Sequence, residues 1–189
     1  MKEILRQNII NRLGPDVQGL ETVLDCFSEL SVKRNSFLLE QGSVCNKVYF
    51  VVKGCLQVFV YDNEMNETTR DIFIEGDWCS ELISFGKGIP SKENIKATEN
   101  TDLLYLKKED FERFITTIPH FDLAHKQILD ELYENSVNRI NTFVSLSALE
   151  RIQWLMQNRP TLMTRVSSKL IASYLGIHKD VFSRLKAKL

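Results

Sequence analysis

The side chains with the clearest chemical purpose lie near the C-terminus, on a predicted helix that follows a tight turn. His178, Lys179, Ser183 and Arg184 fall near the outer face of that helix. Arginine and lysine can donate hydrogen bonds to the O6 and N7 atoms of guanine, and a carboxylate such as that of Asp180 can accept one from the N4 amino group of cytosine. These residues therefore predict a helix that contacts base edges in the major groove of DNA.

The distribution of charge points to the same end of the chain. From Ser147 to Leu189 there are eight basic and two acidic residues, a net charge of +6, while residues 1–146 carry −7. A basic end on an acidic body favours contact with a polyanion, although an ordinary solvated helix surface is the alternative. Lys169, Lys186 and Lys188 are better placed for phosphates, which add affinity without reading sequence.

The residues around the turn have the pattern of a helix-turn-helix. Gly176 supplies the left-handed backbone that a tight turn needs, and the small Ala172 permits close approach of a second helix. Ser167 or Ser168 is expected to cap the first helix. A helical hairpin that merely packs is the alternative. The apolar positions expected to hold the two helices together are Ile171, Leu175, Ile177, Val181 and Leu185.

No pattern in the sequence predicts catalysis or a metal site. There is no nucleophile elbow, P-loop or dinucleotide fingerprint, so we expect no enzyme. The four cysteines, Cys26, Cys45, Cys55 and Cys79, are 19, 10 and 24 residues apart and form no Cys-x-x-Cys pair. Buried, reduced thiols are the expected state, with redox sensing as the alternative.

Composition predicts a globular protein of the cytoplasm. The 189 residues are 43 % hydrophobic and 26 % charged. No stretch approaches the ~18 consecutive apolar residues that span a bilayer, and the first residues do not have the pattern of a signal peptide. We therefore expect no membrane association.

Periodicity divides the chain into helical and strand-rich parts. Residues 3–13 and 16–30 have helical spacing, the second with Asp16 as its cap. Short runs of strand chemistry separated by turns then predict a sandwich, barrel or jelly roll. The predicted strands are 37–39, 48–52, 56–61, 68–74, 95–97 and 103–106, and the later helices begin at Lys108, Pro119 and Ser147, the last ending at Arg159-Pro160.

The predicted helix over 119–146 is long enough to serve as a dimerisation helix. A helix of about 25 residues exceeds what one small domain usually covers. Leu129, Leu132, Ser136, Arg139 and Phe143 follow the alternating 3- and 4-residue spacing of a helix seam, which Ser136 and Arg139 interrupt. Packing of the helix on its own domain is the alternative. The predicted domains are 1–118, 119–146 and 147–189.

The order of several short motifs resembles the cyclic-AMP receptor protein / fumarate–nitrate regulator (Crp/Fnr) family of bacterial transcription factors. The resembling segments are Leu39–Gly42, Val48–Gly54, Ile74–Trp78, Ser80–Leu82 and the C-terminal helix-turn-helix. The resemblance implies an α+β fold with an N-terminal β-roll sensor, a long dimerisation helix and a helix-turn-helix. In it, Lys179, Asp180 and Arg184 fall where members carry an Arg-Glu-x-x-x-Arg pattern that contacts bases.

The nucleotide-binding cassette of that family is only partly present. The resemblance places an effector pocket around Trp78, Glu81, Leu82, Ser91 and Lys92, where Glu81 would bond a ribose hydroxyl. The arginine that pairs with the cyclic phosphate in members falls on Ser91, and Lys92 is displaced by one residue. Without the guanidinium a buried phosphate loses a strong charge-assisted bond, so we expect no cofactor and no binding of cyclic AMP. A role at the start of a helix is the alternative for Glu81.

Other features of the family are also missing. The N-terminal cysteine cluster of its oxygen-sensing branch is absent, and neither His120 nor His125 has the setting of a haem ligand. The sequence ends at Leu189, directly after the second helix, so we expect either that a complete β-wing is missing or that part of the natural chain is.

The sequence favours a homodimeric regulator that binds a pseudo-palindromic operator in double-stranded DNA, with RNA polymerase as a further partner. The alternative is a small-molecule sensor module whose C-terminal helices bind protein or have lost DNA binding. An effector in either case acts only through different affinities for two arrangements of the chain.

Overall fold

The computed structural model describes residues 1–189, and the chain divides into two compact units. The N-terminal unit contains Met1–Val60 and Asp71–Asp130, and the C-terminal unit contains Tyr61–Arg70 and Glu131–Leu189. In this division the long helix is shared between the two units, and residues 61–70 of the strand-rich region group with the C-terminal helices. The three domains expected from the sequence stay a prediction.

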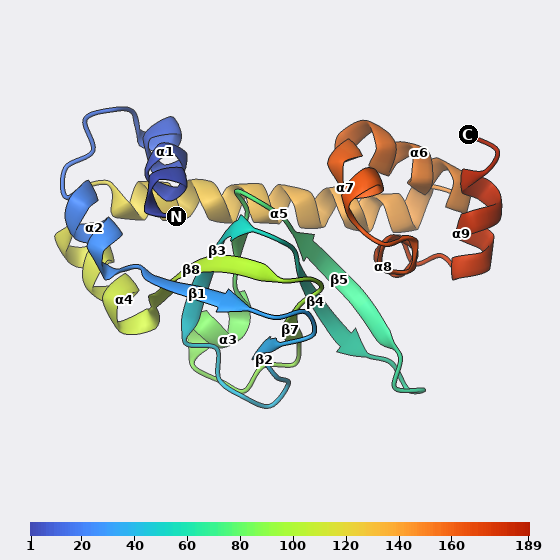
Figure 1. Cartoon of the computed structure of the whole chain (residues 1–189), viewed down its shortest axis with the longest axis horizontal. Coiled ribbons are helices and arrows are strands. Elements are labelled where there is room, and N and C mark those ends of the chain that lie inside the picture. Colours follow the sequence, from blue (N-terminus) through green and yellow to red (C-terminus); the bar gives the residue numbers. More distant parts are fainter. The chain divides into compact units, whose positions relative to one another are not determined.

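Nine helices and eight strands make up the chain (Figure 1). The strands are β1 (Ser28–Val32), β2 (Phe37–Leu39), β3 (Lys47–Lys53), β4 (Leu56–Tyr61), β5 (Glu67–Phe73), β6 (Trp78–Cys79), β7 (Asn94–Ala97) and β8 (Thr101–Lys107). The helices are α1 (Lys2–Leu13), α2 (Leu20–Cys26), α3 (Leu82–Lys87), α4 (Lys108–Thr117), α5 (Phe121–Ser145), α6 (Ala148–Asn158), α7 (Pro160–Arg165), α8 (Ser168–Tyr174) and α9 (Lys179–Lys186).

The strands form two four-stranded sheets, in the orders β1-β8-β3-β6 and β2-β7-β4-β5. Neighbouring strands run antiparallel, as in the pairing of β1 with β8 from Ser28 opposite Tyr105 to Val32 opposite Thr101. The predicted α+β class with a jelly-roll-like sandwich is confirmed, and the strands do not close into a barrel.

The predicted helix over 16–30 is wrong at both ends. Helix α2 covers only Leu20–Cys26, and its N-cap is Gly19, with no side-chain cap from Asp16. The following residues are in strand β1, because all five of them pair with β8. Leu20, Val23 and Leu24 are buried at helical spacing, so the apolar pattern was informative only for α2 itself. Long-range pairing decided the remainder.

Three short elements were not predicted. Pro160, taken as the end of a helix, is the first residue of α7, where its missing N–H costs nothing. Helix α3 and strand β6 are too short for a periodic pattern to reveal them.

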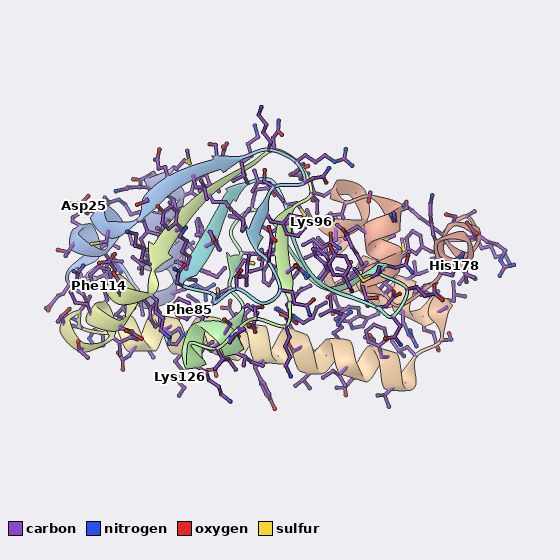
Figure 2. All side chains as sticks on the ribbon, turned by 90° about the horizontal axis from the view of Figure 1, so that it is seen from below. Asp25, Phe85, Lys96, Phe114, Lys126 and His178 are labelled. Atoms are coloured by element: carbon purple, nitrogen blue, oxygen red, sulfur yellow. The ribbon has the colours of Figure 1, made fainter.

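The core of the N-terminal unit joins helices α1, α2 and α4 to one sheet. Phe50 and Leu104 of the sheet are buried in this core. Phe114 of α4, labelled in Figure 2, is buried there as well. Trp78 packs against it, with its ring 5.1 Å from that of Phe50, and its indole N–H donates to Asn8 of α1 at 3.1 Å. This core anchors β6 and the start of the α3 segment.

The cysteines are free thiols, and Cys45, Cys55 and Cys79 are buried. Burial of Cys55 and Cys79 agrees with the apolar patterns around them. No helix in the structure is both long enough and apolar enough to cross a bilayer.

Candidate nucleic-acid interface

The C-terminal unit contains the predicted helix-turn-helix. Ser167 caps α8, its hydroxyl accepting a hydrogen bond from the N–H of Leu170 at 3.3 Å. Gly176 lies in the turn with φ of 62°, in the left-handed region that favours glycine. The N–H of Ile177 then returns to the carbonyl of Ala172 at 2.9 Å, which ties the turn to α8.

The interior of the motif contains the predicted residues and one more. Ile171, Ala172, Leu175 and Ile177 are buried as expected. On α9, however, the fully buried side chain is Phe182, whereas Val181 and Leu185 are only half-buried. All three lie on one face of the helix, and Phe182 is the most buried of them. The sequence-based prediction followed only the aliphatic residues and missed Phe182. The size of its aromatic ring could have indicated that it is buried.

The remaining surface of α9 is open to solvent. Lys179, Asp180, Ser183 and Arg184 are all exposed, as the sequence predicted for the base-contacting group. Lys169, Lys186 and Lys188, predicted to contact phosphates, are exposed as well. Helix α9 therefore presents a polar, largely basic surface that its buried Phe182 fixes toward solvent.

His178 differs from the rest of the predicted group because it precedes the helix. It is the N-cap of α9, and its Nδ1 atom accepts from the N–H of Asp180 at 3.4 Å. Figure 2 shows His178 at the outer edge of the C-terminal helices. Its imidazole also lies 3.7 Å from the Asp180 carboxylate, an ion pair when the ring is protonated.

The predicted seam of α5 separates into two sets of residues. Arg139 donates to the carbonyls of Thr69 and Tyr174, and its guanidinium lies 4.8 Å from the Phe143 ring centroid. Both residues therefore contact their own C-terminal unit and are not on an open seam. Ser136 is exposed, and Leu129 and Leu132 are half-buried.

A different set of apolar residues on α5 is exposed. The exposed fractions are 71 % for Tyr133, 59 % for Ile140 and 81 % for Val144. With the half-buried Val137, these residues recur at steps of 4, 3 and 4, the spacing of a helix seam. We call these four residues the α5 stripe. It is offset from the predicted seam by about one position.

The predicted effector-pocket residues differ in burial and in hydrogen-bond partners. Glu81 is buried and caps α3, its two carboxylate oxygens accepting from the N–H groups of Ile83 at 3.1 Å and Ser84 at 2.9 Å. These contacts match the alternative in which Glu81 acts at the start of a helix. Trp78 packs against the helix–sheet core described above, and Leu82 is exposed.

Ser91, at the position of the phosphate-binding arginine, is buried in a local turn. Its hydroxyl donates to the carbonyl of Glu93 at 2.8 Å and accepts from the N–H of the same residue at 3.0 Å. Lys92 is exposed. A separate cavity of about 350 Å³ in the N-terminal unit is lined by residues 37–40, 43–47 and Tyr49. None of the predicted pocket residues lines it.

The strand-rich part of the chain matches a family model by sequence. Residues 29–117 match the family model "Cyclic nucleotide-binding domain", and the match runs from β1 to the end of α4. The chain is also similar to the "cAMP-activated global transcriptional regulator CRP" of Salmonella typhimurium and of Escherichia coli O157:H7. Each is 20 % identical over 160 residues, which cover 79 % of this chain and 76 % of the relative.

Solved structures extend the similarity of fold beyond the cyclic nucleotide-binding domain. FixK2 from Bradyrhizobium japonicum has a TM-score of 0.76 at 14 % identity, and the match covers 86 % of this chain and 84 % of FixK2. A mutant of CooA from Carboxydothermus hydrogenoformans has a TM-score of 0.71 at 22 % identity, with coverages of 96 % and 82 %. The resemblance to Crp/Fnr-type regulators is thus confirmed.

Proposed function

We propose that this chain is a sequence-specific DNA-binding transcription regulator of the Crp/Fnr type that acts as a homodimer. The observation that carries the proposal is the exposed surface of α9, where Lys179, Ser183 and Arg184 face solvent while Phe182 is buried. A helix held in this way can enter the major groove, with its polar side chains directed at base edges. The exposed lysines around it would contact phosphates.

Dimerisation through the α5 stripe would complete the DNA-binding form. Tyr133, Ile140 and Val144 give α5 an exposed apolar face of the kind that a second helix covers. Two copies of α9 separated by one turn of DNA, about 34 Å, would bind a pseudo-palindromic operator. RNA polymerase is a further proposed partner, on the basis of the family resemblance.

The proposed regulator does not use cyclic AMP. Both oxygens of Glu81 are engaged by backbone N–H groups, and Ser91 offers no positive charge at the phosphate position. A cyclic phosphate would have to be desolvated without a guanidinium partner. Isothermal titration with cyclic AMP at concentrations up to about 1 mM is expected to give no heat of binding. Saturable binding with a micromolar Kd would contradict this part of the proposal.

The test of DNA binding is selection of bound fragments from random double-stranded DNA, without effector, at two salt concentrations. We expect enrichment of a pseudo-palindrome and a steep loss of affinity with salt. The double variant Lys179→Ala/Arg184→Ala should abolish enrichment. The matched control Lys33→Ala/Lys87→Ala removes the same charge from exposed positions of the N-terminal unit and should retain enrichment. No enrichment by the unmodified chain, with or without cyclic nucleotides, would favour the sensor-module alternative.

A further inference from the structure

Backbone groups at the outer edge of strand β5 form hydrogen bonds with a side chain of the helix-turn-helix. Strand β5 is last in its sheet, so one row of its peptide groups lacks a neighbouring strand. Within the C-terminal unit, the hydroxyl of Ser173 accepts from the N–H of Thr69 at 2.9 Å and donates to the carbonyl of Glu67 at 3.1 Å. A hydroxyl can do both at once, and here it replaces the backbone of a missing strand.

Arg139 of α5 also forms a hydrogen bond with the same edge of β5. Its Nη2 atom donates to the carbonyl of Thr69 at 2.8 Å and to that of Tyr174, in the last turn of α8, at 3.0 Å. The guanidinium also lies 4.9 Å from the Tyr174 ring centroid. Both peptide groups of Thr69 that face this edge are therefore bonded to residues of α5 and α8. A cation beside the C-terminal carbonyls of α8 is also favoured by the helix dipole.

A second arginine joins the ends of α5 and α8. Arg151 lies 4.8 Å from the Phe143 ring centroid and donates to the carbonyls of Phe143 and Leu175, each at 3.2 Å. Since Ile177 is bonded to Ala172 and Phe182 is buried in the motif, the orientation of α9 follows that of α8. The contacts of Thr69 thus bear on the direction in which the DNA-facing side chains point.

We propose that Glu67, Thr69, Arg139 and Ser173, which we call the β5 clamp, preorganise the recognition helix for DNA. The inference rests on the proposed function. Arg139 and Ser173 are positioning residues, since they act through α8 and are not on the exposed face of α9. The clamp leaves that face open, with Lys179, Ser183 and Arg184 all exposed, so it orders the reading helix and does not cover it.

Strand β5 itself connects the clamp covalently to the N-terminal unit. Residues 67–70 of β5 belong to the C-terminal unit, whereas Asp71–Phe73 of the same strand belong to the N-terminal unit. Ile72 and Phe73 are buried. A shift of β5 that accompanies effector binding would therefore reach Thr69 within three residues. The difference in affinity between the clamped and unclamped forms would set the size of the response.

The first test compares Ser173→Ala with Ser173→Thr in the full chain, using the selected DNA fragment. Ser173→Ala removes both hydrogen bonds. Because alanine is a better helix former than serine, the substitution does not weaken α8 itself. We expect DNA affinity to fall roughly 5- to 50-fold. Ser173→Thr keeps the hydroxyl and should stay near the unmodified chain. Arg139→Lys keeps the charge but not the fork, and should lose affinity as Ser173→Ala does.

The dependence of affinity on salt separates positioning from direct contact. Neither Ser173 nor Arg139 is assigned to a phosphate, so Ser173→Ala and Arg139→Lys should keep the salt slope of the unmodified chain. Lys186→Ala, in contrast, should reduce that slope by about one. Unchanged or increased affinity in Ser173→Ala would overturn the proposal, as would a reduced salt slope in Arg139→Lys.

Hydrogen exchange at Thr69 tests the clamp without DNA. The Thr69 amide should exchange on the order of tenfold faster in Ser173→Ala than in the unmodified chain, because its acceptor has been removed. If the unmodified chain binds no DNA, the proposed function fails, yet slow exchange at Thr69 would still establish the contact. Equal exchange in the two proteins would show that no clamp forms in solution.

Discussion

The ring of Phe143 lies against Gly176, so closely that a Cβ atom built on the glycine would overlap the ring. Gly176 also has a φ of 62°. Two separate requirements therefore favour glycine at this position: the left-handed turn between α8 and α9, and contact of the turn with α5. The contact ties the helix-turn-helix to the C-terminal end of the long helix, beside the arginines that brace it.

Gly176→Ala should destabilise the chain by about 2–4 kcal/mol, because the strain of a left-handed alanine adds to the overlap with Phe143. The free energy of unfolding in urea measures the loss. Gly86→Ala is the matched control, since Gly86 lies in α3 with ordinary φ and nothing within 4 Å of an added Cβ, and it should be neutral or slightly stabilising. Combining Gly176→Ala with Phe143→Ala removes the overlap but not the strain. If Gly176→Ala matches the control, the turn must have a different conformation.

Glu81→Ala should lower stability by about 1–2 kcal/mol, since it removes the N-cap of α3 and leaves the N–H groups of Ile83 and Ser84 without their acceptors. Thermal unfolding measures the loss, and Glu134→Ala, at an exposed position on α5, controls for removal of a carboxylate. A ribose-binding role predicts the opposite pattern, with stability unchanged and nucleotide affinity lost.

The sequence was most informative where one local signal determined one structural feature. Gly176 and the exposed lysines of α9 are such cases, as are the strands over 56–61 and 103–106 that β4 and β8 contain. It was least informative where partners distant in sequence decided the outcome. Residues 28–32 form a strand because β8 lies beside them.

Partners distant in sequence also explain why two residues of the predicted α5 seam do not lie on an open face. Arg139 and Phe143 have seam spacing, but the carbonyls of Thr69 and Tyr174 and the contact with Gly176 turn them toward their own unit. No periodicity within α5 contains that information. The capping role of Glu81 was among the expected alternatives, whereas the clamp around Thr69 depends on residues 70 and 104 positions away from it in sequence.

Stability should fall as the pH is lowered through the titration of His125. The half-buried imidazole packs on Phe111, with ring centroids 4.8 Å apart, and this burial lowers the pKa of His125 below its usual value. The neutral ring is therefore favoured in the folded chain. Its contribution is complete above the unfolded-state pKa of about 6.5 and is lost as the pH falls through the folded-state pKa.

The measurement is the urea midpoint at pH 7.5 and at pH 5.5, in the unmodified chain and in His125→Leu. Other groups titrate in this range in both proteins, so the difference between them isolates His125. We expect the unmodified chain to lose more stability on acidification than the variant does. An equal loss in both would mean that protonation of His125 has the same cost in the folded and unfolded states.

Ile140→Asp should prevent self-association if the α5 stripe is the dimer interface. A carboxylate at that position would be buried without a partner and would face its counterpart in the second copy, at a cost of several kcal/mol. Sedimentation equilibrium should give about twice the chain mass of 21.9 kDa for the unmodified protein and a value near the chain mass for the variant. Asn138→Asp places the same charge on an exposed residue away from the stripe and should remain dimeric. A dimeric Ile140→Asp variant would show that the α5 stripe is not the dimer interface. A monomeric unmodified chain would contradict dimerisation through α5 in the absence of DNA.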